Sequence, residues 1–243
     1  MRTQTSPSSL ATKAGAICRS VVSSIADAVT IADPSPSQRQ PSIGAPVGNL
    51  GLTSTYETVA LLIDNSSSMR ERFEGAADKL AAAKMGAATF ILEKYRHHPH
   101  DAVGVISFCS APTVLTNPLP VRSAKAQLLR AISPLAANGG TNITKALEAA
   151  EEMLLIKHVA QVPRIVLLTD GHGGNARQVA QRLKDSGVTI QCVGVGNDPS
   201  AVDEALLHDI ASTIDGCLQY VFVRNLHSLM GTYTGLSALG VLK

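Results

Sequence analysis

The chain has 243 residues, of which 45% are hydrophobic, so it is long and apolar enough for one domain with its own core plus an extension. Its formal net charge is only +2 at pH 7, and the absence of any block of basic residues argues against nucleic-acid binding. No stretch of the sequence is long and apolar enough to span a lipid bilayer.

The four cysteines of the chain lack Cys-x-x-Cys spacing. Cys109 and Cys192 fall in or at the ends of apolar runs that are expected to form buried strands. They are therefore expected to pack as small hydrophobic residues rather than to form a disulfide or a zinc site. Since nothing else points to an oxidising compartment, the sequence predicts a cytoplasmic protein.

The N-terminal part differs in composition from the rest and is rich in Ser, Ala, Thr and Pro. Residues 1–31 form an extension whose apolar residues recur at helical spacing, which predicts an amphipathic helix. Residues 32–54 read as a Ser/Pro-rich linker that is extended and mobile. The extension carries basic residues but no acid before Asp27, so an organellar transit peptide remains an alternative to a cytoplasmic location.

Two kinds of apolar segment alternate from residue 55 to residue 237. Short apolar runs bounded by turn formers predict buried strands at 58–63, 102–108, 113–115, 163–169, 188–195 and 218–224. Apolar residues at helical spacing predict helices at 78–95, 123–132, 142–157, 175–186, 202–214 and 226–237. This order predicts an α/β fold with a doubly wound, mostly parallel central sheet and helices on both faces. The strand at 113–115, flanked by prolines, is expected to be a short antiparallel edge strand, and residues 238–243 a tail.

Polar side chains follow the first of these strands at alternate positions. Asp64, Ser66 and Ser68 place one carboxylate and two hydroxyls on a loop that can curl so that all three point at one spot. Such oxygens suit a hard divalent cation that tolerates retained waters. The alternative is a Ser-rich turn with an Asp cap.

Two further loops are expected at the same edge of the sheet. Gly139 and Gly140 precede Thr141 at the entrance of the helix at 142–157, and Asp170 ends the strand at 163–169. Because ligands of open parallel sheets bind at the carboxyl ends of the strands, three separate segments are expected to deliver oxygens to one point.

In these motifs the chain resembles the von Willebrand factor type A (VWA) domain family, over about residues 55–237 and in the form typical of prokaryotic intracellular members. The family's metal-ion-dependent adhesion site is Asp-x-Ser-x-Ser, then a Thr, then an Asp, on three loops. The resemblance assigns this site to Asp64, Ser66, Ser68, Thr141 and Asp170. All five residue types are present, which implies an intact site that holds Mg²⁺, or Mn²⁺ in vitro.

The resemblance also implies a function. The domain is expected to be a protein-binding adaptor or scaffold rather than an enzyme, with its Mg²⁺ coordinating a Glu or Asp of a partner protein. Intracellular relatives often act beside AAA-type ATPases, in stress-response or metal-insertion assemblies. The rim that reads the partner is expected to consist of Asn65, Ser67, Met69, Arg70, Asn142, His172 and Asn175.

Two other functions remain open. The first is a metal-dependent hydrolase or phosphatase with Asp64 as its nucleophile. Against it, Ser66 and Ser68 stand where a second carboxylate is wanted, and the three loops hold no lysine except Lys145, inside the helix. The second is a metal-independent scaffold that acts through its N-terminal helix, which an Asp64→Ala variant would leave active.

Overall fold

The computed structural model describes residues 56–155, 161–171 and 173–238. The predicted N-terminal extension and linker lie outside the described residues, as do His172 and the tail from residue 239.

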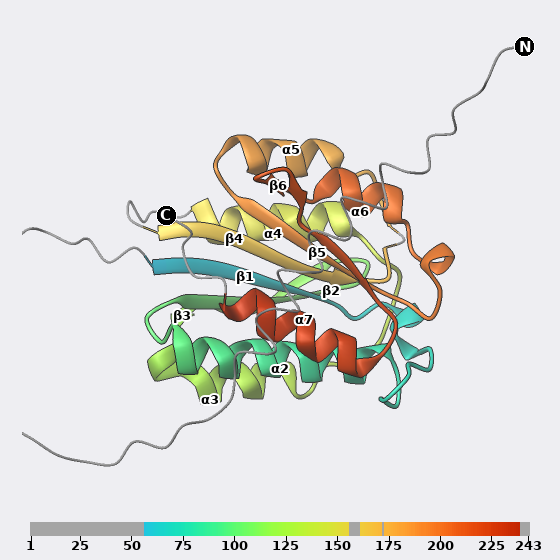
Figure 1. The fold of residues 1–243 in the computed structure, drawn as a ribbon, viewed down its shortest axis with the longest axis horizontal. Coiled ribbons are helices and arrows are strands. Elements are labelled where there is room, and N and C mark those ends of the chain that lie inside the picture. Colours follow the sequence, from blue (N-terminus) through green and yellow to red (C-terminus); the bar gives the residue numbers. More distant parts are fainter. Residues whose placement is uncertain (1–55, 156–160, 172, 239–243) are drawn as a thin grey trace, which may run out of the picture. The chain divides into compact units, whose positions relative to one another are not determined.

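A six-stranded sheet in the order β3-β2-β1-β4-β5-β8 forms the centre of the domain (Figure 1). Neighbouring strands are parallel, except that β3 runs antiparallel to β2. The predicted doubly wound, mostly parallel sheet is therefore confirmed. Its strands are β1 (Tyr56–Asp64), β2 (Ala102–Phe108), β3 (Pro112–Pro120), β4 (Gln161–Thr169), β5 (Thr189–Val195) and β8 (Tyr220–Val223).

Helices cover both faces of the sheet (Figure 1). One face carries α2 (Lys79–His97), α3 (Val121–Ile132) and α7 (Leu226–Ala238). The other carries α4 (Ile143–Leu155), α5 (Arg177–Asp185) and α6 (Glu204–Ile210). Because side chains alternate along a strand, Leu61 of β1 packs in the first core and Leu62 in the second.

The short elements lie in the connections. Two single-turn 3₁₀ helices, η1 (Ser67–Arg70) and η2 (Pro199–Ala201), follow β1 and β5. A small hairpin of β6 (Thr213–Ile214) and β7 (Cys217–Leu218) lies between α6 and β8. The helix expected at 202–214 therefore ends at Ile210, because the chain turns back through Asp215 (φ 50°) and Gly216 (φ 76°).

The antiparallel edge strand is longer than predicted. It spans Pro112–Pro120 rather than residues 113–115, and its register along β2 shifts near Val105. An edge strand is paired on one side only, so prolines without an N–H are tolerated there. Pro112 and Pro118, which were predicted to flank the strand, lie at its start and within it.

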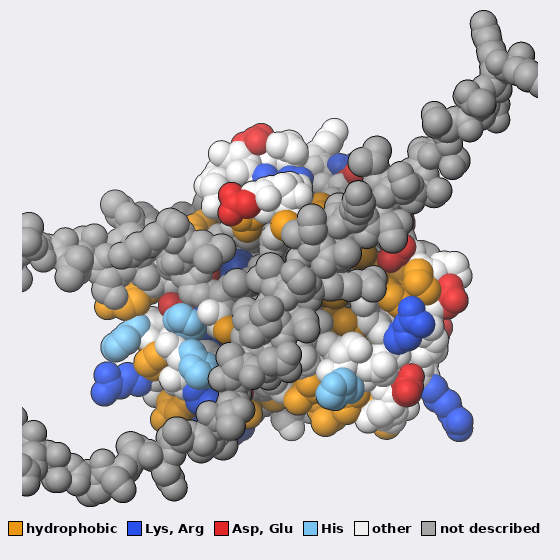
Figure 2. Space-filling model, in the orientation of Figure 1, with side chains coloured by type: hydrophobic (Ala, Val, Ile, Leu, Met, Phe, Trp, Pro, Cys, Tyr) orange, Lys and Arg blue, Asp and Glu red, His pale blue; other side chains and the backbone are white. Residues whose placement is uncertain are grey.

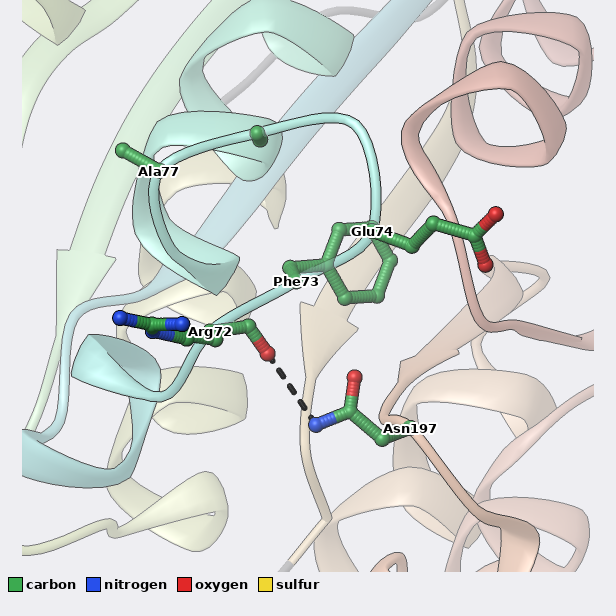
Figure 3. A pocket seen from close by; sticks show the side chains of 6 residues that line it. Arg72, Phe73, Glu74, Ala77 and Asn197 are labelled. Atoms are coloured by element: carbon green, nitrogen blue, oxygen red, sulfur yellow. Dashed lines mark hydrogen bonds between the residues drawn. The ribbon is translucent and has the colours of Figure 1, made fainter.

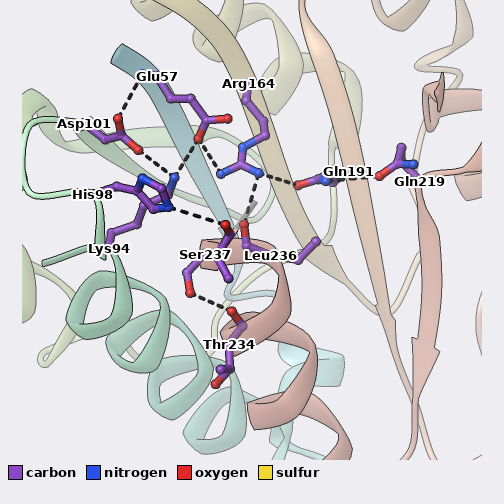
Figure 4. A network of polar contacts seen from close by, with 11 residues as sticks. Glu57, Lys94, His98, Asp101, Arg164, Gln191, Gln219, Thr234, Leu236 and Ser237 are labelled. Carbon is purple, nitrogen blue, oxygen red and sulfur yellow. Dashed lines mark hydrogen bonds and ion pairs between the residues drawn. The ribbon is translucent and has the colours of Figure 1, made fainter. Parts of the chain in front are cut away.

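A buried network of charges ties the elements together where β1 begins (Figure 4). Lys94 Nζ of α2 lies 2.7 Å from carboxylate oxygens of both Glu57 and Asp101. Arg164 of β4 binds Glu57 at 2.7 Å and donates to the carbonyl oxygen of Leu236 in α7 at 3.1 Å. Two buried acids thus face two buried bases, at the end of β1 opposite Asp64.

The outer surface shows mixed charge. On the described part of the face in Figure 2, Lys and Arg side chains are interspersed with Asp and Glu, without a continuous basic patch. This agrees with the low net charge. Within residues 56–155, 161–171 and 173–238, no helix has the length and apolar character needed to cross a membrane.

Candidate functional site

Three loops meet at the carboxyl ends of β1 and β4. Ser67 N donates to the carbonyl oxygen of Gly139 at 3.0 Å, which joins the loop after Asp64 to the loop before α4. Ile143 N donates to the carbonyl oxygen of Gly173 at 3.3 Å, which joins the start of α4 to the loop after β4. The structure therefore brings together the three segments on which the five predicted ligands lie.

Asp64 lies at the centre of this arrangement and is fully buried. Its Oδ1 accepts a 2.8 Å hydrogen bond from Ser66 N, and its Oδ2 accepts a 2.6 Å bond from the Thr169 hydroxyl. Burial raises the pKa of Asp64 from 3.8 to about 6, helped by the nearby charge of Asp170 and opposed by these hydrogen bonds. In the protein alone, ionisation of this carboxylate is therefore more costly than in water, and a bound cation would lower that cost.

The two serine hydroxyls lie next to each other. Ser66 Oγ and Ser68 Oγ are 3.1 Å apart, with Ser66 buried and Ser68 half-buried. The turn of η1, which begins directly after Ser66, brings these alternate side chains to the same side. The hydroxyls thus present a pair of neutral oxygens beside the buried carboxylate.

Asp170 is the second buried carboxylate and is 2% exposed. Its Oδ2 lies 3.4 Å from Lys79 Nζ. Its Oδ1 is buried and has no hydrogen-bond partner in the described part of the chain. A buried polar atom left unpaired is costly, so this oxygen is available to a ligand.

Thr141 lies against the loop that follows Asp170. A Cβ added to Gly173 would stand 2.4 Å from the carbonyl oxygen of Thr141 and 2.9 Å from its Cβ. Only glycine permits this approach, so Gly173 lets the Thr141 loop close over the end of β4.

The donor set fits a hard divalent cation such as Mg²⁺. It consists of oxygens alone, two from carboxylates and three from hydroxyls, and it includes the unpaired oxygen of Asp170. The site differs from a metal site built from His, Cys, Asp and Glu alone. Among the described residues, no group of three or more of these residue types is placed to hold a metal.

Most residues of the predicted rim are exposed to solvent or half-buried. The Asn65 side chain donates to the carbonyl oxygen of Ala136 at 3.0 Å. Asn142 Oδ1 accepts from Lys145 N at 3.0 Å and so caps α4. The side chains exposed to solvent are those of Ser67, Arg70 and Asn175.

Met69 differs from the expectation. Its side chain is fully buried and belongs to the core between the sheet and α2. The turn of η1 points Met69 inward while Ser67 and Arg70 face outward. Met69 is therefore a packing residue and not part of the rim.

Two residues of the site were not predicted from the sequence. Thr169, directly before Asp170, orients Asp64 through its hydroxyl. Lys79, the first residue of α2, reaches Asp170 from outside the three loops, a contact that was not predicted from the lysines within the loops. Thr169 could have been predicted, because it directly precedes a predicted ligand in the sequence. The contact of Lys79 with Asp170 could not, because it depends on how α2 packs.

A hollow of about 560 Å³ lies beside the segment that follows η1 (Figure 3). The Asn197 side chain donates to the carbonyl oxygen of Arg72 at 3.1 Å across it. The side chains of Arg72 and Glu74 extend toward opposite sides, so the hollow has charges of both signs at its margins. It is lined by Arg72, Phe73, Glu74, Ala76, Ala77 and Asn197.

The chain is similar in sequence to known proteins. The family model of the von Willebrand factor type A domain matches residues 59–172. Calcium-activated chloride channel regulator 1 of Bos taurus is 25% identical over 189 residues, which cover 77% of this chain and 20% of that protein. The chain thus spans about a fifth of the length of this curated relative, which is mammalian and does not support the expected prokaryotic type.

Solved structures show the same fold. The von Willebrand factor type A protein from Catenulispora acidiphila has a TM-score of 0.61 at 20% identity, over 76% of this chain and 42% of that chain. The VWA domain of SpRpn10 has a TM-score of 0.62 at 20% identity, over 77% of this chain and all (100%) of that chain. VWA domains are in general protein-interaction modules and not enzymes. The family model covers residues 59–172, and together with the sheet order these structures show that the chain has the VWA, Rossmann-like fold.

Proposed function

We propose that this domain binds a partner protein through a magnesium ion held by Asp64, Ser66, Ser68, Thr141 and Asp170. The observation that carries the proposal is the pair of buried carboxylates, one with an unpaired oxygen, beside two adjacent hydroxyls. When bound, the ion would supply a coordination position that a Glu or Asp of the partner takes in place of water.

The residues of the chain prepare the site for this role. Thr169 and the backbone N of Ser66 hold the Asp64 carboxylate in one orientation. Hydroxyl ligands neutralise a cation less than carboxylates do, so they leave it attractive to an incoming anion. The exposed side chains of Ser67, Arg70 and Asn175 then contact the partner residues around this acid. Mn²⁺ is expected to replace Mg²⁺ in vitro.

The hydrolase reading is the weaker alternative. Lys79 does supply a cation near Asp170, which removes one objection to it. However, a nucleophilic carboxylate needs an oxygen that can reach the substrate, whereas both oxygens of Asp64 accept hydrogen bonds and the residue is fully buried. Asp64 is therefore suited to hold a cation rather than to attack a substrate.

Calorimetric titration of Mg²⁺ tests the metal site. We expect Asp64→Ala and Ser66→Ala to abolish or strongly weaken binding. Ser67→Ala is the matched control, because Ser67 lies between two predicted ligands but is exposed and faces away from them. Equal Mg²⁺ affinity in wild type and Asp64→Ala would overturn the assignment.

The partner and the location belong to the same proposal. We expect a protein partner that presents an acidic side chain, in an AAA-type ATPase or stress-response assembly, in the cytoplasm. The free thiols of Cys109 and Cys192 support a reducing compartment. Affinity capture with Mg²⁺ and with EDTA tests it, because a partner that survives EDTA and the Asp64→Ala substitution does not bind through the ion.

A further inference from the structure

Lys79 connects the candidate metal site to an acid on the surface. Its Nζ lies 2.7 Å from Glu71 Oε2 and 3.4 Å from Asp170 Oδ2. The Lys79 and Asp170 side chains are each 2% exposed, whereas that of Glu71 is 58% exposed. One buried ammonium group is therefore shared between a buried ligand position and an exposed acid.

The backbone fixes the position of this lysine. Lys79 N donates to the carbonyl oxygen of Glu71 at 3.0 Å, so the two residues are joined by their main chains as well as by their side chains. Asp78 caps α2 by accepting from Ala81 N at 2.6 Å, which sets the first turn of the helix. Lys79 thus enters the site from a rigid element.

Lys79 lies at different distances from its two acidic partners. In the described part of the chain, it is the one cation that forms an ion pair with either Asp64 or Asp170. Its 2.7 Å contact with Glu71 is that of a charge-assisted hydrogen bond, while 3.4 Å to Asp170 is longer than such bonds normally are. The contact with Asp170 is the weaker of the two and can be given up with little movement.

We propose that Lys79 is a tethered cation that competes with Mg²⁺ for Asp170, and that Glu71 holds Lys79 when the metal binds. Without metal, Lys79 partly neutralises Asp170. A divalent cation at the same carboxylates repels the ammonium group, which remains paired with Glu71. The Lys79–Glu71 pair thereby sets the metal affinity of the site, and this inference rests on the proposed function.

The competition predicts opposite effects for the two partners of the pair. Lys79→Met removes the competing charge and is expected to tighten Mg²⁺ binding by about tenfold, as measured by calorimetry. Glu71→Gln leaves Lys79 with Asp170 alone and is expected to weaken binding severalfold. A lysine that merely orients Asp170 would instead make Lys79→Met weaken binding.

Matched controls separate this effect from general changes of charge. Lys84→Met alters a lysine of the same helix that donates to the carbonyl oxygen of Ser133. Glu74→Gln alters an exposed acid of the same loop as Glu71. Both are expected to change the Mg²⁺ affinity less than about twofold.

The outcomes are distinguishable from failure of the proposed function. If wild type binds Mg²⁺ and Asp64→Ala does not, but Lys79→Met binds equally or more weakly, the metal site stands and the competition is overturned. If wild type binds no Mg²⁺, both fail. Should Lys79→Met not fold, Glu71→Gln decides alone, since equal or tighter binding by that variant overturns the competition.

Discussion

Thr169 donates a 2.6 Å hydrogen bond from its hydroxyl to Asp64 Oδ2, across 105 positions of the sequence. The same hydroxyl accepts a 3.0 Å hydrogen bond from Gly171 N, so its own proton is directed at Asp64. The orientation of the central carboxylate of the site therefore depends on a residue outside the five predicted ligands.

Removing this hydroxyl should weaken both the fold and the site. Thr169→Val is nearly isosteric but leaves a buried carboxylate oxygen unpaired, so we expect a loss of about 1–3 kcal/mol of stability in EDTA at neutral pH. Mg²⁺ affinity should fall as well. Urea unfolding and calorimetry measure the two effects. Thr169→Ser keeps the hydroxyl, and equal results for the two variants would show that the bond is unimportant.

The metal-free protein should lose stability as the pH rises. The pKa of Asp64 lies at about 6 in the folded protein, above its ordinary 3.8, so the folded state binds this proton more tightly than the unfolded state. The resulting stabilisation, about 3 kcal/mol, is fully present below about pH 4 and is lost as the pH rises through about 6. Urea unfolding in EDTA over this range measures it.

Two comparisons isolate Asp64 as the cause. Asp64→Asn cannot titrate, so its stability should change less across the same pH range. Saturating Mg²⁺ should restore the stability of wild type at neutral pH but not that of the variant. Identical pH profiles for wild type and Asp64→Asn would contradict the assignment of the pKa.

The buried network at the opposite end of β1 should matter for stability and not for the metal. Lys94→Met leaves Glu57 and Asp101 buried without their shared cation, so we expect a loss of about 3–5 kcal/mol. The control is Arg182→Met, which breaks the more exposed pair with Glu151 and should change the stability far less, because solvent screens an exposed pair. A large change of Mg²⁺ affinity in folded Lys94→Met would contradict this separation.

The rim prediction at His172 rests on the sequence. The family resemblance implies an acid after Asp170 and Gly171, where this chain has His172. The rim is therefore expected to be less negative and more favourable to an acidic partner, most of all below about pH 6.5, where histidine is charged. His172→Glu should weaken partner binding at fixed Mg²⁺. Equal binding of both proteins, still abolished by EDTA, would leave the metal proposal intact and refute the role of His172.

Local sequence pattern was sufficient to predict the strands of the sheet and the residues at which β1 and β4 end. The apolar run before Asp64 and the run before Asp170 each form a strand of the central sheet, because continuous burial leaves a signal in neighbouring residues. The edge strand was predicted too short, because the prolines read as its limits are compatible with an edge that is paired on one side.

The sequence by itself determined which oxygens stand at the ends of β1 and β4 and at the entrance of α4, since those positions follow from hydrophobic periodicity and turn residues. Only the tertiary structure decided that Met69 is buried and that Lys79 reaches Asp170, 91 positions away. Both depend on how η1 and α2 pack over the sheet. Contacts between residues far apart in the chain leave no periodic signal in either segment, so the electrostatic balance of the site was decided by packing.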